Sequence, residues 1–146
     1  MSFTIREAGL FDLADLLSLY SFLHAEDAPS PEAAGSAWAA IQSDPNHHLL
    51  LAVEEGFAAA SCALVVVPNL TRAARPYALI ENVVTHPDFR GRGLATALLR
   101  RAAELARESG CYKVMLLTGH RDDATLNFYR GAGFNSEDKT AFIQWL

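Results

Sequence analysis

The length, composition and charge of this chain exclude several classes of protein. Its 146 residues, 51% of them hydrophobic, suffice for one domain with a real core. A net charge of −5 argues against a nucleic-acid-binding protein, which would present a basic surface. No apolar stretch approaches the length of a membrane span and no cationic leader precedes one, so we expect a cytoplasmic protein. Cys62 and Cys111 are too few for a disulfide framework or a zinc-binding pattern.

The first third of the chain predicts one strand and two helices. Residues 3–8 alternate apolar and polar side chains, as a half-buried strand does, and after Asp12 apolar residues recur at helical spacing. Ser30 and Pro31 then predict the capped start of a second helix, which ends near Ser43. The acidic loop between these helices either lines the entrance of a substrate pocket or faces solvent.

Two apolar, β-branched runs follow and predict a β-hairpin. They comprise residues 48–54 and 57–67, and Glu55 and Gly56 between them suit a tight turn that needs a glycine. Residues 68–75 form a polar connection to the next strand.

The stretch from Tyr77 to Thr96 is the part of the chain best suited to hold a ligand. Residues 78–85 predict a buried strand, which Pro87 ends because proline cannot donate to a strand ladder. Glycine-flanked arginines then open an amphipathic helix over residues 93–109, with Gly110 after its end.

The start of that helix predicts an anion site. Backbone N–H groups there lack intrahelical partners, and Gly91 and Gly93 let a bulky phosphate approach the backbone closely. The helix dipole and a local basic cluster favour the same charge; the cluster contains Arg90, Arg92, Arg100 and Arg101.

The last part of the chain predicts a strand over residues 113–118, a helix over 122–130 and a final strand over 141–146, with a further strand conceivable over 134–137. The unit made by residues 78–85, 93–109 and 113–118 predicts a parallel β-α-β crossover. We therefore predict a single α/β (α+β) domain over residues 1–146, a mixed sheet with helices on both faces.

Three kinds of phosphate-binding site compete for the glycine-rich segment. A Walker A loop needs a lysine and a hydroxyl residue where Leu94 and Ala95 stand, and a Rossmann fingerprint needs a third glycine where Thr96 stands. The coenzyme A pyrophosphate pattern, Arg or Gln, two residues, Gly, one residue, Gly or Ala, is met by Arg90, Gly93 and Ala95.

At these residues the chain resembles the GNAT superfamily of acetyl-CoA-dependent N-acetyltransferases. The resemblance covers the second half of the chain, through NVVTHPDFRGRGLATALL and then ATLNFYRGAGF. The segments IENVVTHPDFRGRGLA and GCYKVML also resemble those of glucosamine-6-phosphate N-acetyltransferases, although this resemblance is weaker than that to the superfamily. The superfamily resemblance implies a mostly antiparallel twisted sheet and acetyl-CoA as cosubstrate, with no metal.

The resemblance also implies roles for residues of this chain. The strand would bind the pantetheine arm with main-chain groups, the helix start would bind the pyrophosphate, and the short helix would pack beside the pantetheine end. The implied cofactor-binding residues are Val83, Val84, Thr85, Arg90, Gly91, Arg92, Gly93, Leu94, Ala95, Thr96, Asp122, Thr125 and Phe128. Asp122 stands where many relatives have asparagine.

Acyl transfer from a thioester to an amine needs a base, an acid and an oxyanion donor. Tyr129 is the candidate acid that protonates the leaving thiolate. The alternative is that Tyr129 is a core aromatic residue whose hydroxyl contacts solvent. Glu81 is the candidate base, acting directly or through water, or else a surface carboxylate. The N–H of Val83 or Val84, at a bulge, is the candidate oxyanion donor.

We predict from these residues an N-acetyltransferase that acts on a small-molecule primary amine by direct attack in a ternary complex. Glucosamine-6-phosphate enzymes place acidic residues where this chain has Asn82 and Leu117-Thr118, which weakens that particular assignment. The alternatives are a protein or peptide amine acceptor and a non-catalytic acyl-CoA-binding module. We expect no nucleic-acid or membrane partner and allow for a homodimer.

Overall fold

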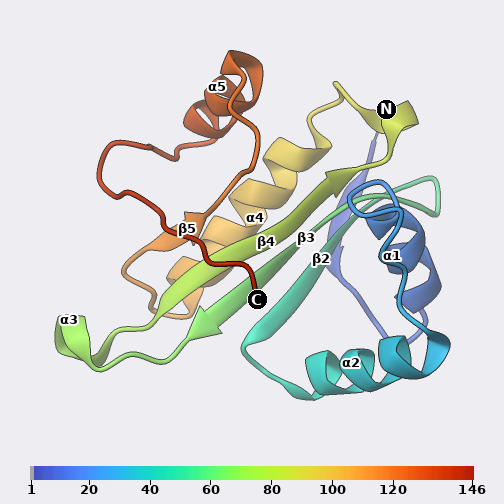
Figure 1. Cartoon of the computed structure of the whole chain (residues 1–146), viewed down its shortest axis with the longest axis horizontal. Coiled ribbons are helices and arrows are strands. Elements are labelled where there is room, and N and C mark those ends of the chain that lie inside the picture. The colour runs from blue at the N-terminus through green and yellow to red at the C-terminus, as the bar shows by residue number, and fades with distance from the viewer. Residues whose placement is uncertain (1) are drawn as a thin grey trace.

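Five strands form one sheet in the order β1-β2-β3-β4-β5 in the computed structural model, which describes residues 2–146 (Figure 1). The strands are β1 (Thr4–Glu7), β2 (His47–Glu54), β3 (Phe57–Val67), β4 (Tyr77–Thr85) and β5 (Val114–Leu116). The helices are α1 (Leu13–Tyr20), α2 (Pro31–Ser43), α3 (Thr71–Ala74), α4 (Leu94–Glu108) and α5 (Asp123–Gly131), with a 3₁₀ turn over Pro87–Phe89.

The sheet is mixed, as predicted. β1, β2, β3 and β4 pair antiparallel in sequence, whereas β4 and β5 are parallel and joined through α4. The predicted hairpin is confirmed: Glu55 and Gly56 both have positive φ, at 51° and 80°, as a tight turn between twisted strands requires. The predicted α/β fold with a parallel β-α-β crossover is therefore correct.

Each face of the sheet carries its own hydrophobic core. α4 packs on one face through Leu94, Leu98 and Leu99, each at most 1% exposed. α1 covers the other face through Leu16 and Leu19 together with Trp38 of α2. Helices therefore cover both faces, and no helix within residues 2–146 has the length and apolarity needed to cross a membrane.

Local signals place the helix ends where the sequence predicts them. The Ser30 Oγ atom accepts a hydrogen bond from the Ala33 N–H at 3.2 Å and caps α2. Gly93 and Gly110 bracket α4 with φ values of 82° and 81°, a left-handed conformation that strains side chains with a Cβ. The start of α4 is thus fixed by a glycine.

The predicted strands over residues 134–137 and 141–146 are wrong, since neither segment is a strand in the structure. Residues 139–146 make no hydrogen bond within the described chain and are all exposed. A strand is stable only when a neighbour satisfies its N–H and C=O groups, and these segments have none within one copy of the chain. The apolar character of these residues alone did not reveal this.

The connection between β3 and β4 contains a left-handed turn that sequence patterns did not predict. Arg72, Ala73 and Ala74 have φ of 54°, 57° and 59°. This conformation brings Cβ close to the following carbonyl oxygen and costs roughly 1–2 kcal/mol per residue for residues other than glycine.

Ala73→Gly is therefore expected to raise the free energy of unfolding by roughly 1 kcal/mol, because glycine adopts the left-handed conformation without strain. Urea denaturation measures the change. Ala40→Gly, on the exposed face of α2, is the matched control and should lower stability by about 1 kcal/mol. Equal losses in both variants would contradict strain at Ala73.

Candidate active site

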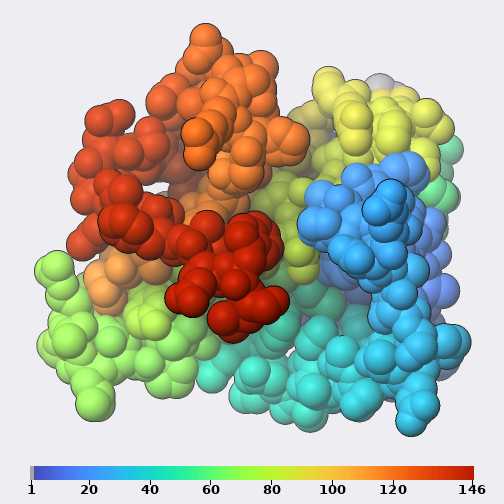
Figure 2. All heavy atoms as spheres, in the orientation of Figure 1, coloured from blue at the N-terminus to red at the C-terminus, as the bar shows by residue number. Residues whose placement is uncertain are grey.

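The two parallel strands, β4 and β5, separate at one edge of the sheet. β4 pairs with β5 only from Ala78 to Ile80, opposite Val114 to Leu116, although β4 continues to Thr85. The second half of β4 therefore has no strand partner on that side (Figure 1). Figure 2 shows the same region as a hollow in the surface between the orange segment and the yellow and blue ones. The sheet thus leaves main-chain groups free next to a surface depression.

A β-bulge lies at the point of separation. The register between β3 and β4 shifts at Cys62, which faces two residues, Asn82 and Val83, and Asn82 has a φ of 54°. Beyond the bulge the His86 N–H donates to the Ala59 carbonyl at 2.8 Å. Because N–H directions alternate along a strand, those of Thr85 and Val83 point away from β3, toward the open side. The bulge predicted in this strand is confirmed.

The start of α4 offers a row of N–H groups beside this open side. The Ala97 N–H makes the first helical hydrogen bond, to the Gly93 carbonyl at 3.0 Å. The N–H groups of residues 94–96 precede the helical ladder and have no intrahelical acceptor. At Gly91 and Gly93 no atom lies within 4 Å of where a Cβ would be. The segment is therefore open to a bulky anion.

The Arg92 side chain links the loop before α4 to the rest of the fold. Its Nη1 atom lies 3.3 Å from Oε1 of Glu54, a carboxylate whose residue is only 7% exposed, and its Nη2 donates to the Asp88 carbonyl at 3.0 Å. The guanidinium also lies over the Phe89 ring, 4.9 Å from its centroid. Its guanidinium thus makes contacts within the fold, although Arg90 and Arg92 are both exposed residues. Sequence reasoning missed Glu54, which carries no local signal because its partner lies 38 positions away.

His86 ties the loop to the α1–α2 connection. Its ring makes edge contacts with Phe22 at 4.9 Å, Phe57 at 5.4 Å and Phe89 at 5.7 Å between centroids. Its Nδ1 accepts a hydrogen bond from the Asp88 N–H at 3.2 Å. This predicted turn residue is therefore also the centre of an aromatic cluster that joins the segment after β4 to the α1–α2 connection and to Phe57 at the start of β3.

Tyr129 of α5 packs on the α4 face of the sheet, in the same cluster as Val83, Leu94 and Phe128. Burial raises the pKa of its hydroxyl above the usual value, and the neighbouring Cys62 thiol adds to the rise. The hydroxyl is therefore protonated at neutral pH, the state that a proton donor needs.

The other predicted residues of α5 lie around Tyr129. Phe128 makes an edge contact with the Tyr129 ring, 5.0 Å between centroids. Asp122 caps α5: it accepts from the Thr125 N–H at 2.9 Å and from the Thr125 hydroxyl at 2.8 Å. These bonds lower the pKa of Asp122, the backbone bond most. Asp122 and Thr125 are thus bonded to one another.

Glu81 lies on the opposite face from Tyr129. It stands directly across from Ala63, on the face that α1 and α2 partly cover, and its side chain is exposed. Val84 is buried on that same face. Glu81 and Tyr129 therefore lie on opposite faces of the sheet, with Tyr129 in the cluster that contains Val83.

Sequence reasoning missed a polar pair beneath the face of the sheet that α1 covers. Burial raises the pKa of Tyr20, at the end of α1, while the nearby Ser61 hydroxyl partly offsets the rise. Ser61 Oγ is fully buried and, within residues 2–146, has no direct hydrogen-bond partner. The two hydroxyls are thus neighbours without a direct bond. A lone serine in an apolar strand gave no signal of this in the sequence.

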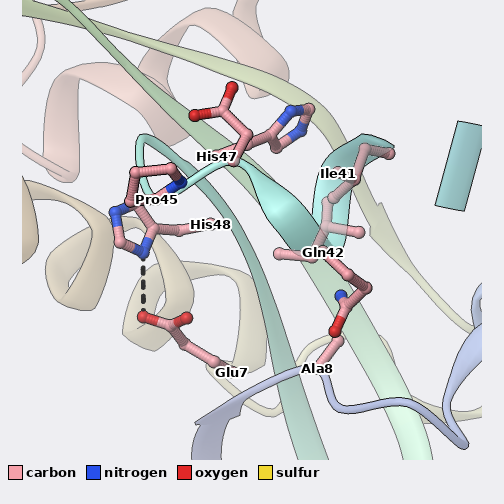
Figure 3. A pocket seen from close by; sticks show the side chains of 9 residues that line it. Glu7, Ala8, Ile41, Gln42, Pro45, His47 and His48 are labelled. Atoms are coloured by element: carbon pink, nitrogen blue, oxygen red, sulfur yellow. Dashed lines mark hydrogen bonds and ion pairs between the residues drawn. The ribbon is translucent and has the colours of Figure 1, made fainter. Parts of the chain in front are cut away.

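A separate cavity of about 180 Å³ lies between the end of β1, the end of α2 and the start of β2 (Figure 3). His48 Nδ1 lies 2.8 Å from Oε1 of Glu7 there, and His47 points elsewhere. Within residues 2–146 no three metal-ligating side chains gather as a metal site requires. Neither Glu81 nor Tyr129, the residues predicted to act in catalysis, lines this cavity.

The fold and the site together define an α/β domain. In it the parallel strands β4 and β5 separate, and the start of α4 beside them offers N–H groups that suit an anion. The family model described as acetyltransferase (GNAT) family matches residues 11–134. The chain belongs to this family of acetyltransferases, as its motifs predicted.

Similar proteins agree with this assignment. The chain is 38% identical over 79 residues to a glucosamine 6-phosphate N-acetyltransferase of Trypanosoma brucei brucei, covering 54% of this chain and 52% of that protein. It is 33% identical over 138 residues to glucosamine 6-phosphate N-acetyltransferase 1 of Oryza sativa subsp. japonica, covering 84% of this chain and 77% of that protein. The chain thus spans only about half of the trypanosomal relative.

A solved structure covers nearly the whole chain. A putative acetyltransferase from Agrobacterium tumefaciens str. C58 superposes with a TM-score of 0.90 at 44% identity, covering 97% of this chain and 99% of that one. The fold assignment therefore extends over nearly the whole chain.

Proposed function

We propose that this chain transfers an acetyl group from acetyl-CoA to a primary amine of a small molecule, by direct attack in a ternary complex. We place it in the cytoplasm and allow for a homodimer. The observation that carries the proposal is the bulge at Asn82, where β4 leaves β5 and Tyr129 packs nearby. The alternatives are a protein or peptide amine as acceptor, and an acyl-CoA-binding module without turnover.

The residues present fit coenzyme A. The helix start has N–H groups without acceptors, Gly91 and Gly93 leave space where a side chain would stand, and the exposed Arg90 adds positive charge. We assign the pyrophosphate to residues 90–96 and the pantetheine arm to the main chain of residues 83–85. Phe128 and the Asp122–Thr125 cap would border the pantetheine end.

Bound acetyl-CoA supplies the acetyl group as a thioester, whose carbonyl carbon forms a bond to the amine nitrogen as its bond to sulfur breaks. Glu81 accepts the proton that the amine loses, directly or through water. Tyr129 donates its hydroxyl proton to the departing sulfur, a role that its raised pKa allows. The Val83 N–H, directed to the open side, stabilises the negative charge on the carbonyl oxygen.

The acceptor is a small amine in this proposal because the named relatives of known substrate act on an aminosugar phosphate. Solved structures of aminoglycoside acetyltransferases share the fold at 16–17% identity and add nothing on the acceptor. Asn82 and Leu117-Thr118 lack the acidic side chains expected of glucosamine-6-phosphate enzymes. We therefore propose a small amine without naming the molecule.

Glu81→Gln is expected to lower kcat/KM for the amine about 100-fold near neutral pH, because glutamine cannot accept the proton. The loss should shrink as the pH approaches about 10, where an alkylamine is already largely neutral. A pH series of coenzyme A release measures both effects. Glu55→Gln, on the exposed β2–β3 turn, is the control and should keep full activity. An unchanged rate in Glu81→Gln would remove the base role.

The acceptor class is tested by coenzyme A release across aminosugar phosphates, aminoglycosides, simple alkylamines and peptides. We expect turnover above background with at least one small amine and none with peptides. Turnover with peptides alone would favour the alternative acceptor. Background rates with every amine, together with measurable acetyl-CoA binding, would favour the binding module.

A further inference from the structure

The loop before α4 has little backbone structure of its own. Gly91 and Gly93 both have positive φ, at 75° and 82°, and their N–H groups donate no hydrogen bond within residues 2–146. Glycine adopts many backbone conformations at similar cost, so two glycines leave a short loop poorly defined by its backbone alone. Arg92 stands between them, and its side chain is therefore the group through which the fold can fix this loop.

Arg92 pairs with a carboxylate that is buried at the end of β2. Its Nη1 atom lies 3.3 Å from Oε1 and 3.4 Å from Oε2 of Glu54. Glu54 is 7% exposed, and within residues 2–146 the only other buried acidic residue is Asp12, at 9%. A buried carboxylate is costly unless a cation compensates it, so Glu54 holds the guanidinium at this position.

The β2–β3 turn contacts the same loop at a second point. Phe57 stands directly across the hairpin from Glu54, and its ring stacks on that of Phe89, 5.3 Å between centroids. The Arg92 guanidinium lies over the Phe89 ring, 4.9 Å from its centroid. Its Nη2 atom donates to the Asp88 carbonyl at 3.0 Å. The Arg92 side chain therefore ties the loop both to the hairpin and to the 3₁₀ turn before it.

We infer that Glu54 is a positioning residue for coenzyme A: through Arg92 it holds residues 90–96 in the conformation that receives the pyrophosphate. The inference rests on the proposed coenzyme A site and assigns Glu54 no part in the proton transfers. A loop that is already ordered loses less conformational entropy when it binds, so the Glu54 contact raises coenzyme affinity without touching the reacting atoms.

The first test compares Glu54→Gln with Asp12→Asn by calorimetric titration of coenzyme A. Both variants take a buried carboxylate from an arginine, because Asp12 pairs with Arg6 at 2.7 Å, but Asp12 caps α1 away from the loop. We expect the Kd to rise about tenfold in Glu54→Gln and to stay within about twofold in Asp12→Asn.

Three results of this titration would overturn the inference. An unchanged Kd in Glu54→Gln would mean that the carboxylate does not order the loop. Tighter binding would mean that Glu54 competes with the coenzyme for Arg92. Equal losses in the two variants would mean a general effect of lost stability. A wild-type chain that binds no coenzyme A would contradict the proposed function itself, and the inference with it.

Steady-state kinetics separate positioning from a part in the reaction. In Glu54→Gln the KM for acetyl-CoA should rise about tenfold, while kcat at saturating acetyl-CoA should stay within about twofold. A lowered kcat with an unchanged KM would contradict a positioning role.

A double variant tests whether Glu54 acts through Arg92. We expect Glu54→Gln/Arg92→Gln to have the same Kd for coenzyme A as Arg92→Gln, within about twofold, because the carboxylate then has no guanidinium to hold. Losses of affinity that multiply in the double variant would mean that the two side chains act independently, which contradicts the inference.

Hydrogen–deuterium exchange without coenzyme tests the loop directly. Peptides that cover residues 86–97 should exchange faster in Glu54→Gln than in the wild type and at the wild-type rate in Asp12→Asn, because local order sets the exchange rate. Urea denaturation of both variants measures their global stability, which should fall to a similar extent. Wild-type exchange of residues 86–97 in Glu54→Gln would show that Glu54 does not order the loop.

Discussion

Tyr129→Phe is expected to lower kcat about 100-fold while the KM for acetyl-CoA stays within about twofold, a typical loss for a general acid. The ring contacts with Phe128 and the core remain, so the substitution removes only the hydroxyl group that donates the proton. Steady-state kinetics at saturating amine measure the change, with coenzyme binding measured separately by calorimetry.

The pH dependence adds a second readout for Tyr129. The protonated hydroxyl is the active form, and burial raises its pKa above the usual 10. The Tyr129-dependent part of kcat should therefore be constant through neutral pH and fall only as the pH rises through that raised pKa. Tyr112→Phe is the control, because the half-buried Tyr112 ring contacts Arg72 and Lys113 and was given no role in the reaction. Equal kcat values for wild type and Tyr129→Phe would remove the acid role.

Gly93→Val is expected to weaken acetyl-CoA binding at least about tenfold, which corresponds to about 1.4 kcal/mol. Gly93 has a φ of 82°, and a β-branched residue there is strained, so the loop would shift and move the N–H groups at the start of α4. Calorimetric titration of acetyl-CoA into each variant measures the change.

Gly110→Val separates this effect from a general loss of stability. Gly110 has nearly the same φ, 81°, but lies at the other end of α4. Both variants should lose similar stability in urea, and only Gly93→Val should lose coenzyme affinity. Equal affinity in the two variants would mean that the loop at Gly93 does not hold the coenzyme.

The elements that the sequence predicts correctly are those with local causes. A positive φ at a turn calls for glycine, and Gly56 and Gly93 stand where the chain needs it. A side-chain cap needs only a hydroxyl three positions before an N–H, and Ser30 provides it for α2. The glycine-rich loop and its helix were predictable for the same reason.

Features that depend on distant partners were not predictable. The ion pair between the Arg92 guanidinium and the Glu54 carboxylate joins residues far apart in the chain. The bulge at Asn82 depends on the register of β3 against β4 at Cys62. The tail over 141–146 has a strand pattern, but whether it pairs depends on an edge elsewhere. Each requires knowledge of the packed sheet.

The most direct test of the proposed coenzyme A site is a crystal structure with coenzyme A bound. We predict that the pyrophosphate lies against the N–H groups of residues 91–96. We also predict that the sulfur reaches hydrogen-bonding distance of the Tyr129 hydroxyl, in the opening beyond Ile80 and Leu116 where the strands separate. Coenzyme bound outside that opening, or a sulfur directed away from Tyr129, would contradict the account.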